Sequence, residues 1–239
     1  MPEFLNNIRC ADKKISVKRQ YINTSAIMLF GIILGVFSKF LDENLVDIIF
    51  EYLDNNSVNI SPLLLFEYSD IVHDIANFLS RFAIWVFLAL CISVYSISPI
   101  RAAINVFLFF AGMVASYYLY SNYIAGFFPK SYAMIWVGFT VISPVLAFLC
   151  WYAKGRSKMS LALASGIIAV LFNMTFVYRF PYYINIRSAL ELLVFICGCV
   201  VMRRQTAKES VLMMAIGVVL APILDIVIPI QFQFVFHFG

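Results

Sequence analysis

Long apolar stretches alternate with short polar segments along most of the chain. A helix that crosses the hydrocarbon core of a bilayer needs roughly 20 mostly apolar residues, and seven stretches approach or reach that length. None of them alternates with period 2, as a transmembrane β-strand does. The pattern predicts an all-α, polytopic integral membrane helical bundle with about seven transmembrane helices, at residues 24–41, 78–97, 102–120, 132–152, 159–177, 188–202 and 211–230.

The first 23 residues are polar and basic, and no small-residue cleavage site follows the first apolar stretch. We therefore expect this stretch to be a retained signal-anchor rather than a removed signal peptide. No internal repeat or second soluble domain interrupts the remainder. The chain is thus predicted to consist of a basic cytoplasmic leader, residues 1–23, and a single transmembrane bundle domain, residues 24–239.

Composition agrees with a chain that lipid surrounds. Hydrophobic residues make up 63% of the sequence and charged residues 13%, whereas a soluble domain averages about 45–50% and about 25%. So few polar side chains cannot cover a water-facing surface, which excludes a soluble globular protein, a disordered chain and a disulfide scaffold. Nucleic-acid binding is excluded as well, because there is neither a basic domain nor a set of aromatic platforms. The lipid bilayer is the first expected partner.

Lysine and arginine gather on every second connection between the predicted spans. Cytoplasmic segments of membrane proteins carry the excess of these residues. With the leader inside, twelve of the 17 basic residues fall on inner segments and three on outer segments. The sequence therefore predicts a multi-pass protein of the cell membrane, with its N-terminus in the cytoplasm and its C-terminus outside.

The outer connection between the first two spans, residues 42–77, holds eight of the 13 acidic residues and no lysine or arginine. Its segment 45–54 places acids at i, i+4 and i+7 among apolar residues, which predicts an amphipathic helix at the outer interface. Farther along, polar residues spaced by three and four form one stripe that descends into the second span. The members of this stripe are Glu67, Asp70, Asp74, Asn77 and Arg81.

Charged residues inside the predicted spans are costly, at about 2.5–3.5 kcal/mol each near a helix centre unless they are paired or hydrated. There are four of them, Lys39, Arg81, Glu191 and Asp225. The predicted topology puts all four in the outer halves of their helices, together with Asn173. Two cations and two anions can neutralise one another.

Two interpretations of these groups follow. In the structural one, Arg81 pairs with Asp225 or Glu191, and Lys39 extends to the interface or pairs with an acid of the outer connection, Asp42 or Glu43. In the functional one, the groups surround a polar cavity that opens to the outside. The candidate binding residues are Arg81, Asp225, Glu191, Asn173, Asp74 and Lys39.

Gly31 and Gly35 lie four residues apart in the first span, a spacing typical of closely packed membrane helices. They serve either a contact within the chain or one with a protein partner or a second subunit. The acidic outer connection is the other candidate surface for a partner.

Motifs for catalysis are missing. The two histidines cannot supply the three that a zinc hydrolase of this layout requires, and no nucleophile or phosphate-loop motif occurs. We assign no catalytic residue, metal or cofactor. The sequence favours a transport or solute-capture protein that takes a small polar or amphipathic solute. A non-catalytic membrane partner, such as an assembly, immunity or sensor component, is the alternative, and a lipid-modifying enzyme is the third hypothesis.

Overall fold

The computed structural model describes residues 8–10, 16–43, 71, 73–124, 126, 130–179 and 182–227. The acidic segment 44–70, with the predicted amphipathic helix 45–54, and the tail from residue 228 lie outside the described residues. The helices and the two strands are α2 (Val17–Glu43), α5 (Phe82–Tyr95), α6 (Pro99–Tyr123), α7 (Lys130–Ala153), α8 (Lys158–Thr175), β1 (Phe176–Arg179), β2 (Tyr183–Ile186), α9 (Ala189–Met202) and α10 (Ala207–Val227).

Each predicted span overlaps these helices, with differences in their bounds. The helical segment His73–Ser80 meets α5 at a bend of 60°, so the second apolar stretch is not one straight helix. Helix α8, which corresponds to the predicted span 159–177, ends at Thr175. The chain then enters an antiparallel hairpin in which Phe176 pairs with Ile186. The elements of the described part are otherwise helices, as the long apolar stretches without period-2 alternation predicted.

Five helices of the described part are long and apolar enough to cross a membrane: α2, α6, α7, α8 and α10. The bent pair formed by His73–Ser80 and α5 makes a sixth if it counts as one span. Helix α9 has 14 residues, fewer than the roughly 20 that a straight crossing needs. The protein is therefore a polytopic helical membrane protein with five or six candidate spans, and the seventh stays a prediction.

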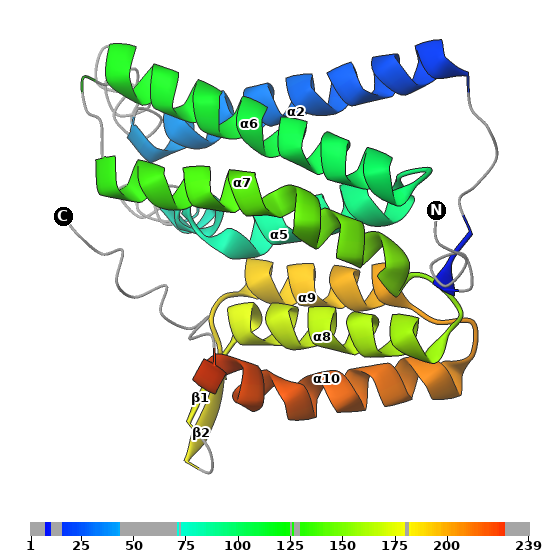
Figure 1. Ribbon diagram of the computed structural model, residues 1–239. Coiled ribbons are helices and arrows are strands. Elements are labelled where there is room, and N and C mark those ends of the chain that lie inside the picture. The colour runs from blue at the N-terminus through cyan, green and yellow to red at the C-terminus, as the bar shows by residue number, and fades with distance from the viewer. Residues whose placement is uncertain are drawn as a thin grey trace, which may run out of the picture.

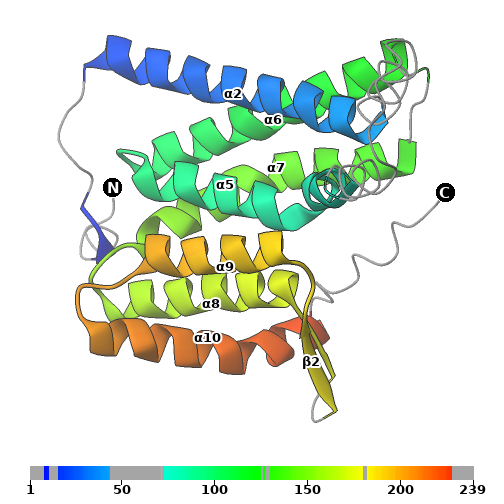
Figure 2. The same cartoon turned by 180° about the vertical axis from the view of Figure 1, so that it is seen from behind.

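Successive helices along the chain run in opposite directions, so that α2 at one edge lies parallel to its neighbour α6, and α10 at the other edge lies parallel to its neighbour α8 (Figure 1). Figure 2 shows the same order from behind. We call the end from which β1 and β2 project the hairpin end. The opposite end carries the turns at residues 154–158 and 203–208, rich in lysine and arginine, and is called the basic end.

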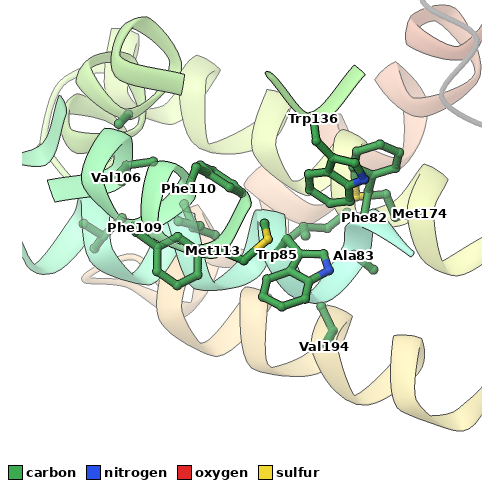
Figure 3. Packing of buried hydrophobic residues seen from close by; sticks show 14 of the residues in the cluster. Phe82, Ala83, Trp85, Val106, Phe109, Phe110, Met113, Trp136, Met174 and Val194 are labelled. Carbon is green, nitrogen blue, oxygen red and sulfur yellow. The ribbon is translucent and has the colours of Figure 1, made fainter. Parts of the chain in front are cut away.

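Aromatic side chains fill the centre of the bundle. Phe82 of α5 stacks on Trp136 of α7 with ring centroids 4.6 Å apart, and Trp85 meets the same indole edge-on at 6.3 Å. Figure 3 shows these rings packed together, with Phe109 and Met113 of α6 on the other side of Trp85. Outward faces stay apolar, with residues such as Val141 and Val219 each 67% exposed. Such faces fit a lipid environment rather than water.

Small residues bring α2 and α6 into close contact. A Cβ atom at Gly31 or Gly35 would overlap the main-chain carbonyl oxygen of Phe109 or Met113, and one at Gly112 would lie 2.8 Å from that of Met28. The glycine pair thus packs within the chain and is not a surface for a partner subunit. Because lipid provides no hydrophobic force between helices, close packing of this kind holds α2 to the bundle.

A Gly35→Leu substitution tests that contact. The leucine has no room beside α6, so we expect the free energy of unfolding to fall by about 1–3 kcal/mol, the usual cost of overpacking. The measurement is unfolding of the full-length protein in mixed micelles with increasing SDS. Ile33→Leu, at a position 57% exposed on the same helix, is the matched control and should leave stability unchanged; equal stability of the two variants would contradict the packing role of Gly35.

Candidate functional site

An ion pair joins two helices at the hairpin end. Nη1 of Arg81 lies 2.7 Å from Oε1 of Glu191, and the exposed fractions of the two side chains are 32% and 0%. Arg81 stands at the bend just before α5, and Glu191 lies in the first turn of α9. Of the two partners predicted for Arg81, the structure shows Glu191.

Ser188 completes the binding of the buried carboxylate. As N-cap of α9 it donates its hydroxyl hydrogen to Oε2 of Glu191 and accepts a hydrogen bond from the Glu191 amide at 3.4 Å. A serine followed three residues later by glutamate is the sequence signature of a helix start, and an anion is favoured there by the helix dipole. This spacing was present in the sequence and would have placed Glu191 at a helix N-terminus.

Arg187 is a further member of this cluster that the sequence did not single out. It lies between β2 and α9, and its amide donates to the carbonyl of Thr175 at 2.9 Å. Burial lowers the pKa of the Arg187 guanidinium, nearby Arg81 lowers it further, and Glu191 acts in the opposite direction. Arg187 therefore lies near the Arg81–Glu191 pair, in the connection that leads into α9.

Asn173 belongs to a separate contact. Its side-chain amide donates to the carbonyl of Ala221 at 2.8 Å, and its oxygen accepts from the Tyr178 hydroxyl at 2.7 Å. These bonds tie α8 to α10 and to β1. Ala221 directly precedes Pro222, which lies inside α10, and Asp225 follows one turn later, partly exposed. Asn173 is fully buried and holds helices together at this point.

Lys39 and Asp74 belong neither to the Arg81–Glu191 pair nor to the contact of Asn173. Lys39 is 4% exposed on α2, with its ammonium nitrogen 5.4 Å above the ring of Tyr117 on α6. Asp74 is exposed on the helical segment His73–Ser80. The bend of 60° after that segment also interrupts the predicted polar stripe, so that Asp74 and Arg81 do not share one helix face.

A small cavity of about 20 Å³ lies among α2, α5, α6, α7 and the segment His73–Ser80. That volume is enough for a water molecule. Five aromatic side chains and several small ones line it; they include Ser38, Ala76, Ser80, Trp85, Tyr117, Tyr118, Tyr132 and Trp136. Its lining contains none of the six predicted binding residues, although Lys39 stands over one lining ring and Arg81 directly follows Ser80.

The segment His73–Ser80 is held over this cavity by two hydrogen bonds. The Tyr132 hydroxyl of α7 donates to the carbonyl of Ser80 at 3.1 Å, and the Trp85 indole of α5 donates to that of Leu79 at 2.7 Å. The structure therefore brings Arg81 and Glu191 together and separates Asn173, Lys39 and Asp74 from them. Within the described ranges, no three His, Cys, Asp or Glu side chains gather as a metal site would require.

At the basic end, lysine and arginine side chains bind main-chain carbonyls, which the sequence did not reveal. Arg204 donates to the carbonyl of Gly155 at 2.6 Å, and Lys154 donates to the carbonyls of Val201 and, at 3.0 Å, Arg203. Burial lowers the pKa of the Lys154 ammonium, and Arg204 and Arg9 lower it further. Residues that indicate orientation thus also satisfy carbonyl groups left free where α7 and α9 end.

Comparisons of the chain with protein-family models, with curated proteins and with solved structures gave no match.

A double-mutant cycle tests the Arg81–Glu191 ion pair. Arg81→Met or Glu191→Met alone should lower the free energy of unfolding by about 3–5 kcal/mol, because each leaves the other charge without its partner. The double variant should lose clearly less than the sum of the two losses. Unfolding of the full-length protein in SDS micelles measures all three, with Arg179→Met on the exposed hairpin strand as control. Additive losses would show that the pair does not couple α5 to α9.

Proposed function

We propose that this protein is an integral membrane protein of transport or solute-capture type, which binds a small amphipathic solute at the hairpin end. The observation that carries the proposal is the aromatic-lined cavity among four helices. Ligand sites are mostly apolar and aromatic, with a few polar groups that fix orientation. Here Ser38, Ser80 and the tyrosine hydroxyls are those groups, and Lys39 places a positive charge behind one wall.

The cavity must enlarge before a solute enters, because its present volume fits only water. The segment His73–Ser80 is the wall best suited to move. It contributes Ala76, Leu79 and Ser80 to the lining and is separated from α5 by the bend. Hydrogen bonds from Trp85 and Tyr132 hold this segment against α5 and α7, and the Arg81–Glu191 pair fixes the bend. In this proposal the segment is a hinged cover, and the ion pair is its hinge rather than the ligand site.

The charge distribution supports an orientation for this site. The cations of the two basic-end turns lie at the opposite end from the cavity, and excess lysine and arginine face the cytoplasm. We therefore place the basic end and the N-terminus in the cytoplasm, and the hairpin end with its cavity outside, in the cell membrane.

An Ala76→Leu variant tests the binding site. The added side chain fills the cavity, so a small molecule that accompanies the wild-type protein should be lost. Native mass spectrometry of the full-length protein, released from mild detergent, detects such a molecule directly. Ala115→Leu makes the same change on an exposed position of α6 and should retain the ligand. Wild-type protein without any bound solute, or Ala76→Leu protein with undiminished solute, would contradict the proposal.

Cysteine labelling tests the orientation. A membrane-impermeant maleimide applied to intact cells should label a Tyr182→Cys, Cys10→Ser variant, since residue 182 is 80% exposed on the hairpin. The exposed native Cys10 should react only after the membrane is permeabilised, with the Cys10→Ser protein as background. Labelling of Cys10 in intact cells would place the basic end outside.

The alternative is a non-catalytic membrane partner. The projecting hairpin favours it: all four residues of β2 are exposed, and the two-stranded sheet of β1 and β2 extends beyond the bundle (Figure 1). In that case the ion pair and the aromatic core serve stability alone, and the Ala76→Leu protein still binds its protein partner.

A further inference from the structure

The hairpin of β1 and β2 lies at the level where a candidate membrane span ends. Helix α8 has 18 residues, which at a rise of about 1.5 Å per residue makes it about 27 Å long, close to the roughly 30 Å of the hydrocarbon core. Strand β1 follows α8 directly, so it begins near the boundary between hydrocarbon and lipid headgroups. Both strands run across the direction of the helices and project past α10 (Figure 1 and Figure 2). With α8 spanning the bilayer, the hairpin is oriented along the membrane plane.

The two faces of the hairpin differ in polarity. Residues paired directly across an antiparallel ladder share a face, and successive residues of a strand alternate between faces. One face, here called the apolar face, carries the pairs Phe176 with Ile186 and Tyr178 with Ile184. The opposite face, called the polar face, carries the pairs Val177 with Asn185 and Arg179 with Tyr183. The hairpin is therefore amphipathic, which is the property of segments that lie in a membrane interface.

The apolar face is directed toward the interior of the bundle, and half of it is open. The Phe176 ring stacks on Phe172, one turn inside α8, with ring centroids 4.4 Å apart, and Tyr178 is buried. These contacts of β1 turn the whole apolar face toward the hydrocarbon side. On β2, the same face carries Ile184 and Ile186, which are 52% and 50% exposed.

The lipid-facing surface of the bundle reaches the level of these isoleucines. Helix α10 ends at the hairpin end, and Ile226 in its last turn is 84% exposed. An apolar side chain so exposed on a membrane helix is in contact with lipid. Because the hairpin projects past this end of α10, the lipid that covers α10 also lies against the open half of the apolar face.

The polar face and the strand edges favour the headgroup region. Arg179 is exposed, and a guanidinium binds phosphate oxygens well. Tyr182 and Tyr183 are exposed too, and tyrosine is enriched at the membrane–water interface. A ladder of two strands also leaves one backbone edge of each strand outside the ladder, and hydrocarbon offers such edges no hydrogen bonds. Headgroups and their water do.

We propose that the hairpin is an interfacial lipid-binding element, with Ile184 and Ile186 among the upper acyl chains and Arg179 among the lipid phosphates. This contact fixes the depth of the helix ends beside it. Helix α9, with 14 residues, is only about 21 Å long, and β2 continues it toward the headgroups. The inference is independent of the proposed solute site and holds for either orientation of the chain.

Spin labels on neighbouring residues of β2 test this proposal. Full-length protein with its five native cysteines replaced by alanine receives Ile184→Cys, Asn185→Cys or Ile186→Cys and is reconstituted in vesicles of equal parts phosphatidylcholine and phosphatidylglycerol. Collisions of the attached nitroxide with oxygen report lipid, and collisions with a nickel chelate report water. We expect the ratio of oxygen to nickel accessibility to be severalfold higher at 184 and 186 than at 185. Val219→Cys, 67% exposed on α10, is the lipid reference.

Two results would overturn the proposal. High nickel accessibility at all three positions would place the hairpin in water, and low accessibility to both reagents at 184 and 186 would show that protein covers the apolar face. If labels at these two positions disturb the fold, the label at 185 is measured with Ile184→Ser and Ile186→Ser in the same chain. Its nickel accessibility should then rise severalfold, because the hairpin has lost its contact with the acyl chains; an unchanged value would also contradict the lipid contact.

Discussion

The hydrocarbon core of a bilayer offers no water to a polar group, and that constraint determines how this bundle holds together. Two fully buried polar side chains, Glu191 and Asn173, bind partners on neighbouring elements. Glu191 binds Arg81 and Ser188, and Asn173 binds the carbonyl of Ala221 and the Tyr178 hydroxyl. Since lipid tails do not push helices together, these bonds and the glycine contacts of α2 give the apolar helices defined neighbours.

The same constraint explains why the two ends of the bundle differ. Helices α5, α7 and α9 end at the basic end, where their free carbonyls attract cations such as Arg9, Lys154 and Arg204. Helix α9 begins at the hairpin end, where its free amides favour the carboxylate of Glu191. The cations from which the sequence predicts an orientation therefore also bind the free carbonyls at helix termini.

The proposed site is the part of the hairpin end that these contacts leave unfilled. The Arg81–Glu191 pair is satisfied at a bend, so it is better suited to hold a hinge than to bind a solute. Beside it, aromatic rings from α5, α6 and α7 leave a small cavity under the segment His73–Ser80. At the other end, Arg9 donates hydrogen bonds to carbonyls near the ends of both α5 and α7.

Local patterns were enough to predict the helices, because an apolar run of about 20 residues has few alternatives in a membrane. The sequence by itself determined the helical membrane class, the contrast between its basic and acidic connections, and the fact that Arg81 and Glu191 need partners. Tertiary structure alone decided that these two residues meet, that Gly35 faces α6, that Asn173 lies apart, and that Arg9 reaches Trp151. Those outcomes depend on which helices become neighbours and on the bend at Arg81, and residues 110 or 142 positions apart leave no local pattern that records their contact.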